Sequence, residues 1–310
     1  MNASLFAYVA LPFRMSAVID LIDLVRLRVD IYHNARVCGD WRLVQHSDGE
    51  ACFHLSTQGG FILDVPSYGN WLVDEGDLVI FPKELPHTMV PVDSFSGPQQ
   101  HLSIPESQDI PGTSMLCGRV TFLHRGSQQL LNALPAVFVI RMTDNTPWLL
   151  RLNDMMLEES LASTKQANAI LNRLTELLMS YALRHFVEQE PRSNGVLALY
   201  SHRHISRAIK AIHEQPAETW SLAALAGIAN MSRTRFAETF KRVSGWSPMQ
   251  YLAWWRMQLA WSLLHSGKHV ANVADEVGYK SEAAFSRVFR KHFDISAGAV
   301  RRSSHGAKVD

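Results

Sequence analysis

SLAALAGIANMSRTRFAETF, residues 221–240, has the pattern of a helix-turn-helix unit. Leu222, Leu225 and Ala226 are spaced three to four apart, so they share one face of a short first helix. Gly227 and Asn230 follow as turn residues. Ser232, four residues before Phe236, is a good N-cap and predicts the start of a second helix. Phe236 and Phe240 on that helix lie at i and i+4, so we expect both rings to point inward.

The same pattern recurs in VANVADEVGYKSEAAFSRVF, residues 270–289, after about 48 to 49 residues. Val270, Val273 and Ala274 take the first helix positions. Gly278 lies in the turn, Ser281 is the cap, and the aromatic pair is Phe285 and Phe289. A plain helical bundle does not need matched turn chemistry at matched offsets. The sequence therefore predicts two helix-turn-helix units.

The segment between the two units, Pro248 to Leu264, predicts one long connecting helix. Proline is tolerated in the first turn of a helix, and an apolar stripe follows it. Seventeen residues at 1.5 Å each give roughly 25 Å. This length suits two recognition helices placed about one DNA turn, roughly 34 Å, apart.

These motifs resemble the DNA-binding domain of the AraC/XylS family over about a hundred residues. The first part of the match runs from Gly245-x-Ser247-Pro248 through Arg256 to Leu263-Leu264, and the second from Val273-Ala274 through Gly278-Tyr279 to Arg290-Lys291. The resemblance implies a transcriptional regulator, an activator, that binds double-stranded DNA and works with RNA polymerase. Two positions depart from the pattern: Asp294 stands where the family often has Gly, and Ala297 where it often has Pro. Both departures put only the geometry of the last turn in doubt.

Composition agrees with a DNA-binding part beside an acidic part. The net charge is only +1, but residues 203–302 carry 15 Lys and Arg against 7 Asp and Glu, and the remainder carries 15 against 22. A basic module is what phosphate contact requires. Three cysteines at wide spacing argue against a secreted disulfide framework, and no apolar run reaches membrane-spanning length. We therefore expect a cytoplasmic protein with no membrane contact.

Residues 27–125 have the texture of a strand-rich domain. Short alternating segments end at turn residues. We predict strands over 38–44, 51–55 and 60–65, a strand-rich stretch over 72–87, a loop over 91–114 and a returning strand over 115–120. Many short strands with Gly and Pro turns are typical of a barrel or jelly roll. The predicted class is thus α+β: a β-barrel with flanking helices, then an all-α domain.

Part of this domain resembles the cupin family. Gly76-x5-Pro82-x4-His87 is similar to the second cupin motif, and His54 stands where the first motif carries its histidines. The match is partial, because Glu84 replaces the usual Gly and no carboxylate follows His54 at ligand spacing. A metal site normally needs three or more convergent ligands. His54 and His87 supply two, and Cys117 is the only candidate for the third. We therefore expect no metal and no cofactor.

The cysteines allow two interpretations. Regulators of the cupin-containing AraC type include oxidant-responsive members with cysteines in this region, which makes Cys38 and Cys117 candidate redox sensors beside the candidate ligand-sensing residues His54 and His87. Oxidation requires an exposed thiol with a low pKa. The alternative, slightly favoured, is that Cys38 and Cys117 are buried and inert. Cys52, on an alternating strand, is expected to be core.

The domain limits are placed where the predicted secondary structure and the composition of the sequence change. Residues 1–14 form an extension expected to be disordered, and Met15, which precedes a predicted helix, is a candidate natural start. We place the cupin-like sensor domain at 15–125, a helical connector at 126–190, a linker at 191–202, the DNA-binding domain at 203–302 and a tail at 303–310. Two connector helices, over 148–161 and 166–187, either cover the barrel or form a homodimer contact. Dimerisation is their usual role in AraC-type regulators.

The outward faces of the two recognition helices are the predicted DNA contacts. Arg suits bidentate contact with guanine, and Glu can accept from cytosine. Basic residues near the helix ends are better placed for phosphates. The predicted contacts are Arg233, Thr234, Glu238, Lys241 and Arg242 on the first helix, and Glu282, Ser286, Arg287, Arg290 and Lys291 on the second.

Three functions compete. The first is a sequence-specific regulator controlled through the cupin domain by a small ligand or by cysteine oxidation. The second is a metal-dependent cupin enzyme fused to a DNA-binding module, against which the incomplete ligand set weighs. The third, a structural chromatin-like binder, would need neither a barrel nor paired readers. We expect a regulator without catalytic residues.

Overall fold

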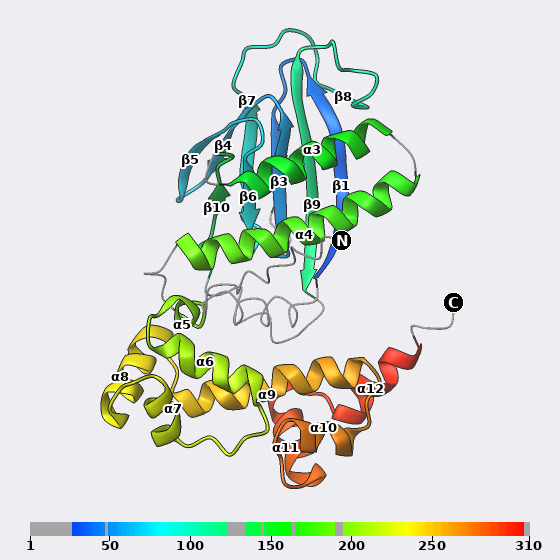
Figure 1. Ribbon diagram of the computed structural model, residues 1–310. Helices are drawn as coiled ribbons and strands as arrows, with labels where there is room; N and C mark the ends of the chain where they lie inside the picture. Colours follow the sequence, from blue (N-terminus) through cyan, green and yellow to red (C-terminus); the bar gives the residue numbers. More distant parts are fainter. Residues whose placement is uncertain are drawn as a thin grey trace, which may run out of the picture. The chain divides into compact units, whose positions relative to one another are not determined.

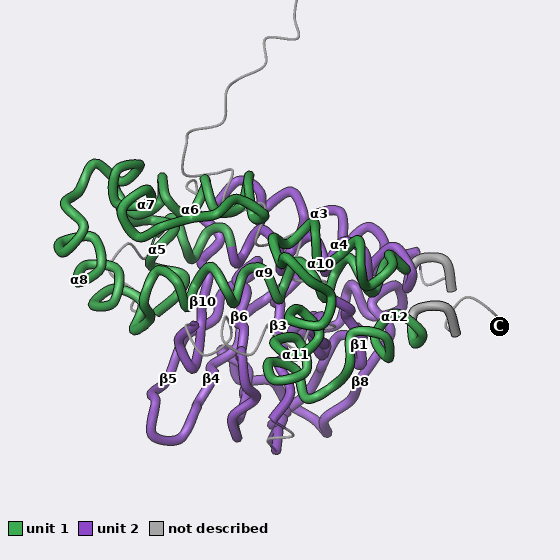
Figure 2. The backbone as a smooth tube through the Cα atoms, turned by 90° about the horizontal axis from the view of Figure 1, so that it is seen from below, with its two compact units in different colours: residues 1–26, 124–133, 184–310 green, residues 27–123, 134–183 purple. Residues whose placement is uncertain are grey.

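The structure is a computed structural model that describes residues 27–46, 49–122, 134–143, 146–162, 165–189 and 195–306. The predicted extension at 1–14, the helix after Met15 and residues 191–194 of the predicted linker lie outside these residues. The chain divides into two compact units, coloured separately in Figure 2. One is rich in strands and the other is helical, and each is described by itself below.

The strand-rich unit consists of two antiparallel sheets and two helices (Figure 1). The strand order is β10-β6-β3-β9-β1-β8 in the six-stranded sheet and β2-β7-β4-β5 in the four-stranded sheet. The strands are β1 (Leu27–Cys38), β2 (Leu43–Gln45), β3 (Ala51–Gln58), β4 (Phe61–Val65), β5 (Gly69–Val73), β6 (Leu78–Phe81), β7 (His87–Pro91), β8 (Gln100–Leu102), β9 (Gly112–Phe122) and β10 (Phe138–Ile140).

Side chains that alternate along the strands of the six-stranded sheet form one hydrophobic core on each of its two faces. On β3, Cys52 belongs to a cluster shared with the four-stranded sheet, whereas Phe53 belongs to a cluster on the opposite face. This second cluster is closed by α3 (Pro147–Ala162) and α4 (Lys165–Gln189), which run across the six-stranded sheet in Figure 1. The period-2 pattern therefore places one face inside the sandwich and the other under helices.

The predicted connector helices cover the sheet with only part of their apolar stripe. Leu171, Leu174 and Leu178 are buried in the cluster beneath α4. Ile170 and Leu177, from the same stripe, remain 44% and 45% exposed. The covering role is thus observed for one side of α4, and an apolar side is left at its surface.

Two predictions about strands are wrong. The predicted strand over 38–44 is interrupted: β1 ends at Cys38, Gly39 turns the chain with φ +79°, and β2 begins at Leu43. A side chain on Gly39 would collide with the carbonyl of Pro98, so both the positive φ and the close approach require glycine. The predicted loop over 91–114 contains β8 and the start of β9.

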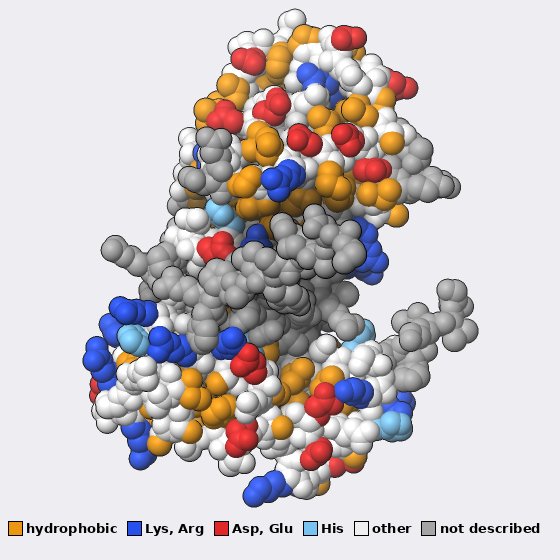
Figure 3. Space-filling view, viewed as in Figure 1, with side chains coloured by type: hydrophobic (Ala, Val, Ile, Leu, Met, Phe, Trp, Pro, Cys, Tyr) orange, Lys and Arg blue, Asp and Glu red, His pale blue; other side chains and the backbone are white. Residues whose placement is uncertain are grey.

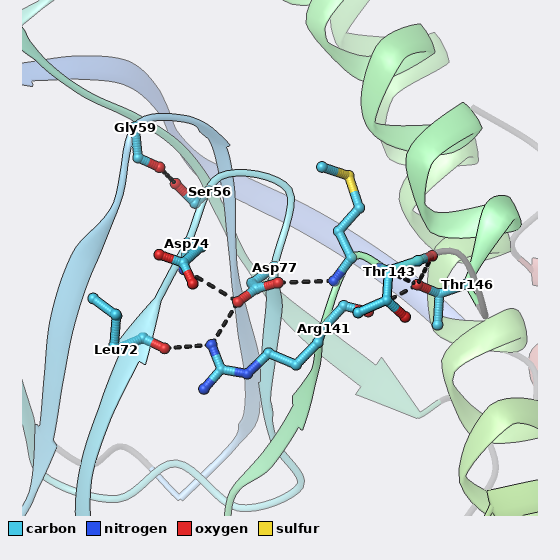
Figure 4. Close-up of polar contacts among 9 residues, drawn as sticks. Ser56, Gly59, Leu72, Asp74, Asp77, Arg141, Thr143 and Thr146 are labelled. Atoms are coloured by element: carbon cyan, nitrogen blue, oxygen red, sulfur yellow. Dashed lines mark hydrogen bonds and ion pairs between the residues drawn. The ribbon is translucent and has the colours of Figure 1, made fainter.

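A buried carboxylate holds the chain between β10 and α3 against the sandwich (Figure 4). Asp77, 2% exposed, accepts hydrogen bonds from the backbone N–H of Met142 at 2.8 Å and of Asp74 at 3.1 Å. Arg141 Nη1 lies 2.5 Å from Asp77 Oδ2 and also donates to the carbonyl of Leu72. Beyond it, the hydroxyl of Thr146 accepts from Thr143 N–H where α3 begins. One acidic side chain thus fixes where α3 starts relative to β6.

The helical unit contains the two predicted helix-turn-helix units joined by one long helix. Its helices are α5 (Ala198–Ser201), α6 (Ile205–Glu214), α7 (Leu222–Ile228), α8 (Arg233–Ser244), α9 (Pro248–His265), α10 (Val270–Glu276), α11 (Glu282–Phe293) and α12 (Ala297–Gly306). Among the described residues, no helix has both the length and the hydropathy needed to cross a membrane.

The predicted caps are confirmed in both units. Ser232 Oγ accepts from Arg235 N–H at the start of α8, and Ser281 Oγ accepts from Ala284 N–H at the start of α11. The turns also match, because Asn230 and Gly278 both adopt positive φ, at 52° and 80°. The turn residue differs, but the left-handed backbone is the same.

The two departures from the family pattern leave the geometry of the last turn intact. Asp294 ends α11 in the left-handed conformation, φ 57°, as Gly245 ends α8 at φ 78°. Ser296 Oγ then accepts from Ala299 N–H, as Ser247 Oγ accepts from Gln250 N–H. Aspartate is among the few side chains that tolerate this conformation. Ala297 therefore begins α12 as Pro248 begins α9.

Candidate functional site

The two recognition helices bury one side and expose the other. Phe236 and Phe240 on α8, and Phe285 and Phe289 on α11, are all 0% exposed. Each helix is therefore fixed in rotation about its own axis by an aromatic pair, as predicted. The residues on the opposite side are determined by that rotation.

The predicted contact residues of α8 all lie at its surface. Arg233 and Thr234 are exposed in the first turn, and Glu238 is exposed one turn later. Lys241 and Arg242 are exposed in the last turn. Arg235, which is also exposed, was not among the predicted contacts. It lies directly before the buried Phe236, so the exposed side of α8 is wider in the first turn than the prediction assumed.

On α11, four of the five predicted residues are exposed: Glu282, Arg287, Arg290 and Lys291. Ser286 is half-buried, so it lies at the edge of the surface and not at its centre. Lys291 belongs to the last turn of α11, as Lys241 belongs to that of α8. The two helices therefore present similar surfaces, each with basic residues in its last turn.

The cations on these surfaces are not neutralised within the described part of the chain. Arg233, Arg287 and Arg290 make no ion pair with a described carboxylate. In contrast, Lys268 of the same unit lies 2.7 Å from Glu276. Cations that are held by the protein are less available to DNA phosphates, so the unpaired ones define the candidate interface.

The spacing of the two surfaces is set by α9. It has 18 residues and is roughly 27 Å long at 1.5 Å per residue. A capping box formed by Ser247 and Gln250 fixes its start. Such a length is close to one turn of DNA, roughly 34 Å.

The second predicted site lies between the two sheets, where His54 of β3 meets His87 of β7. Their Nε2 atoms are 2.9 Å apart, and the residues are 0% and 2% exposed. His87 Nδ1 lies 2.7 Å from the carbonyl of Leu85, which can only accept. His87 Nδ1 therefore carries the proton, His87 Nε2 is an acceptor, and His54 Nε2–H must donate to it. Both rings are neutral in this arrangement.

The third residue predicted to join the histidines does not complete a metal site. Cys117 is paired with His54 across neighbouring strands, so it lies beside the pair. Yet no three His, Cys, Asp or Glu side chains within the described ranges are arranged to hold a metal ion. His54 Nδ1 remains buried without a partner. The observed group is thus a hydrogen-bonded imidazole pair.

The cysteines are buried, which is the alternative that the sequence argument favoured. Cys38, Cys52 and Cys117 are 4%, 1% and 2% exposed. Burial raises the pKa of all three thiols above the ordinary value, most strongly for Cys52 and Cys117. Oxidants react with thiolates, so this environment disfavours Cys38 and Cys117 as sensors in the conformation described.

The imidazole pair predicts that the stability of the strand-rich unit falls in mild acid. Burial lowers the pKa of His54 and of His87 below the ordinary 6.5, and the charge of a protonated His87 lowers the pKa of His54 further. Below pH 6.5 the unfolded chain therefore binds protons that the folded chain does not. The two neutral histidines contribute fully to the free energy of unfolding above about pH 6.5. This contribution is lost as the pH falls below that value, by up to about 1.4 kcal/mol per pH unit for each proton.

We expect His54→Gln to flatten this dependence, because Gln can still donate to His87 Nε2 but does not titrate. Urea unfolding of the full chain at pH 7.5, 6.5 and 5.5 measures it. His46→Gln, an exposed histidine that precedes the sandwich strand β3, is the matched control. Parallel curves for the parent and His54→Gln would contradict the assignment.

Comparisons with known proteins agree with both units. A model of the cupin family matches residues 17–188, and a helix-turn-helix domain model matches residues 225–303. An HTH-type transcriptional regulator of Haemophilus influenzae is 29% identical over 299 residues, covering 91% of this chain and 97% of that protein. The RCS-specific HTH-type transcriptional activator RclR of Escherichia coli is 26% identical over 294 residues, covering 93% and 97%.

Among solved structures, a DNA-binding transcriptional dual regulator from Escherichia coli K-12 is 28% identical. The match covers 32% of this chain and 90% of that one, with a TM-score of 0.31.

Proposed function

The chain belongs to the AraC/XylS family of DNA-binding transcriptional regulators and carries a cupin domain before its DNA-binding domain, and on this basis we propose how it reads DNA. Helices α8 and α11 enter neighbouring major-groove segments of one duplex. Arg233, Thr234 and Glu238 read bases from α8, and Glu282, Ser286 and Arg287 read bases from α11. The residues that contact phosphates are Lys241, Arg242, Arg290 and Lys291.

One observation carries this proposal. Both aromatic pairs are fully buried, so both helices turn their unpaired polar side outward at the same helix positions. A recognition helix reads bases mainly from its first turns, where Arg233 and Glu282 stand. Late cations fit phosphates, because DNA curves away from a helix that lies in the groove.

Arg287→Ala tests base readout. We expect DNA binding to weaken by roughly 1–3 kcal/mol and specificity to relax in one half of the site, because a lost bidentate contact matters only at its own base pair. Lys241→Ala is the matched comparison: it should weaken binding evenly on all sequences and flatten the salt slope by about one unit. Fluorescence anisotropy with the duplex that the parent selects from a random pool measures both. Equal losses of Arg287→Ala on every sequence would assign the residue to phosphate contact.

The cupin domain is proposed to control this reading through a small ligand and not through a catalysed reaction. The buried, high-pKa thiols weigh against oxidation of Cys38 and Cys117. The imidazole pair supplies buried hydrogen-bonding groups that a ligand can engage.

We further propose a homodimer through α3 and α4, and RNA polymerase as the partner in transcription. The support for the dimer is apolar exposure on these helices, at Leu150, Met155, Leu161, Ile170 and Leu177, each between 37% and 48% exposed. Figure 3 shows hydrophobic side chains gathered on the face of the strand-rich unit that carries α3 and α4. Sedimentation of the full chain, with Leu177→Glu as the disrupting variant, tests the contact.

A further inference from the structure

A basic surface extends beyond the base-reading turns of α8, where the turn before α6 meets the last turn of α8. It is formed by Arg203, Arg207 and Arg242, together with His202. None of the three arginines makes an ion pair with a described carboxylate. Neither matched family model includes residues 189–224, so the comparisons assign no role to Arg203 or Arg207.

The surface is built onto α8 by backbone contacts. Gly195 N–H donates to the carbonyl of Val243 at 3.0 Å, which ties the segment before α5 to the end of α8. From there α5 leads directly to His202. Figure 3 shows Lys and Arg side chains gathered at the end of the helical unit where α5 and α8 lie. Any duplex held by α8 therefore passes close to this surface.

His202 is the structural centre of the cluster. Its Nδ1 accepts from the backbone N–H groups of His204 at 3.3 Å and Ile205 at 3.2 Å, so the ring caps α6. With Nδ1 accepting, the proton of the neutral ring must be on Nε2. Burial, then the charges of His204 and Arg242, lowers the pKa of His202. Arg242 is 40 residues away in the sequence, but α5 packs against α8 and the hydrogen bond of Gly195 to the neighbouring Val243 brings the end of α8 close to the turn.

We propose that Arg203, Arg207 and Arg242 form a third DNA contact, which grips the phosphate backbone beside the half-site read by α8. The inference rests on the proposed function, because α8 must lie in the groove for these residues to reach the duplex. The contact carries no base information, since it consists of cations around the N-terminal end of α6, whose helix dipole adds to the positive potential.

The neighbouring cation Lys210 differs from the three arginines because it is paired with a carboxylate of the protein. It lies one turn further along α6, and its Nζ is 3.5 Å from Glu214. A lysine held by an acidic partner brings little net charge to DNA. Lys210→Gln is therefore a control on the same helix, with the same change of formal charge for each residue replaced.

The test compares the parent, the triple variant Arg203→Gln, Arg207→Gln, Arg242→Gln, and Lys210→Gln. The probe is the duplex that the full-length parent selects from a random 40-bp pool. The slope of log affinity against log salt should be flatter by about 2–3 units in the triple variant, since each phosphate contact contributes about 0.9. Between 50 and 200 mM salt, the parent should lose about 40-fold more affinity than the triple variant. Lys210→Gln should keep the parental slope.

Hydroxyl-radical footprinting then places the contact. We expect the triple variant to lose protection of sugars outside the α8 half-site and to keep both major-groove footprints. If the parent selects no duplex, the proposed function itself fails. If it selects one and the slope of the triple variant is flatter by no more than about one unit, the share of Arg242 alone, with the parental footprint kept, only the third contact formed with Arg203 and Arg207 is overturned. A variant with parental DNA binding that fails to support transcription would assign the surface to RNA polymerase, and would also overturn the DNA contact.

Discussion

Phe285→Ala is expected to lower the free energy of unfolding by about 3–5 kcal/mol, the usual effect of deleting a buried aromatic ring. Phe285 is 0% exposed and has ring contacts with Tyr279, at a centroid distance of 5.6 Å, and with Phe289, at 5.5 Å. It packs α11 onto α9 and α10 within one apolar cluster. Losing the ring removes the contacts that fix the rotation of α11.

Phe285→Ala is also expected to weaken DNA binding more than the loss of stability alone would. With α11 free to rotate, Arg287 no longer has a fixed position against the bases. We expect loss of the second major-groove footprint at temperatures where the first half of the domain is still folded. Urea unfolding followed by tryptophan fluorescence measures the first effect, because Trp261 stacks on Phe289. Footprinting measures the second.

Val288→Ala is the matched control for this prediction. Val288 lies on the same helix but is 37% exposed, so the change in stability should stay within about 0.5 kcal/mol. Similar losses for both variants would show that α11 is not held by its aromatic pair.

The repeat was predictable because its information is local. Caps, turns and aromatic spacing all lie within about 20 residues, and Ser232, Ser281 and the four phenylalanines take the places that the periodicity predicts. The positive φ of Asp294 was less evident, because glycine is the usual residue there. The sequence could not show which part of the apolar stripe on α4 is buried. Leu171, Leu174 and Leu178 pack on the sheet, whereas Ile170 and Leu177 extend the stripe onto the exposed side of the helix.

The interior of the sandwich was predicted only in outline. His54 and His87 were identified by motif, but their direct hydrogen bond depends on the register of β3 and β7 in different sheets. The strand β1 was missed as one element, since Tyr32, His33 and Asn34 interrupt its apolar alternation. Its residues are mostly half-buried, so neither face is selected by hydrophobicity. Such long-range pairing is not encoded in a local period.

Asp77→Ala is expected to destabilise the strand-rich unit by about 2–4 kcal/mol. The carboxylate accepts from two backbone N–H groups, Asp74 at 3.1 Å and Met142 at 2.8 Å, and from Arg141 at 2.5 Å. Each buried donor left without a partner costs about 1–3 kcal/mol. The Arg141 side chain is 42% exposed, so water can rehydrate it and its share is the smaller one.

The position of α3 should change together with this loss of stability, because Met142 and Arg141 begin the connection that Thr146 completes. Asp74→Ala, which removes an exposed carboxylate from the same turn but keeps its N–H, is the control and should stay near the parent. Hydrogen exchange of the α3 amides reports the effect: we expect faster exchange at the start of α3 in Asp77→Ala, and unchanged exchange in α8 and α11. Arg141→Ala should cost less than Asp77→Ala, since it leaves both N–H groups bonded to the carboxylate. The reverse order would mean that the ion pair, and not the pair of backbone donors, anchors α3 to the sandwich.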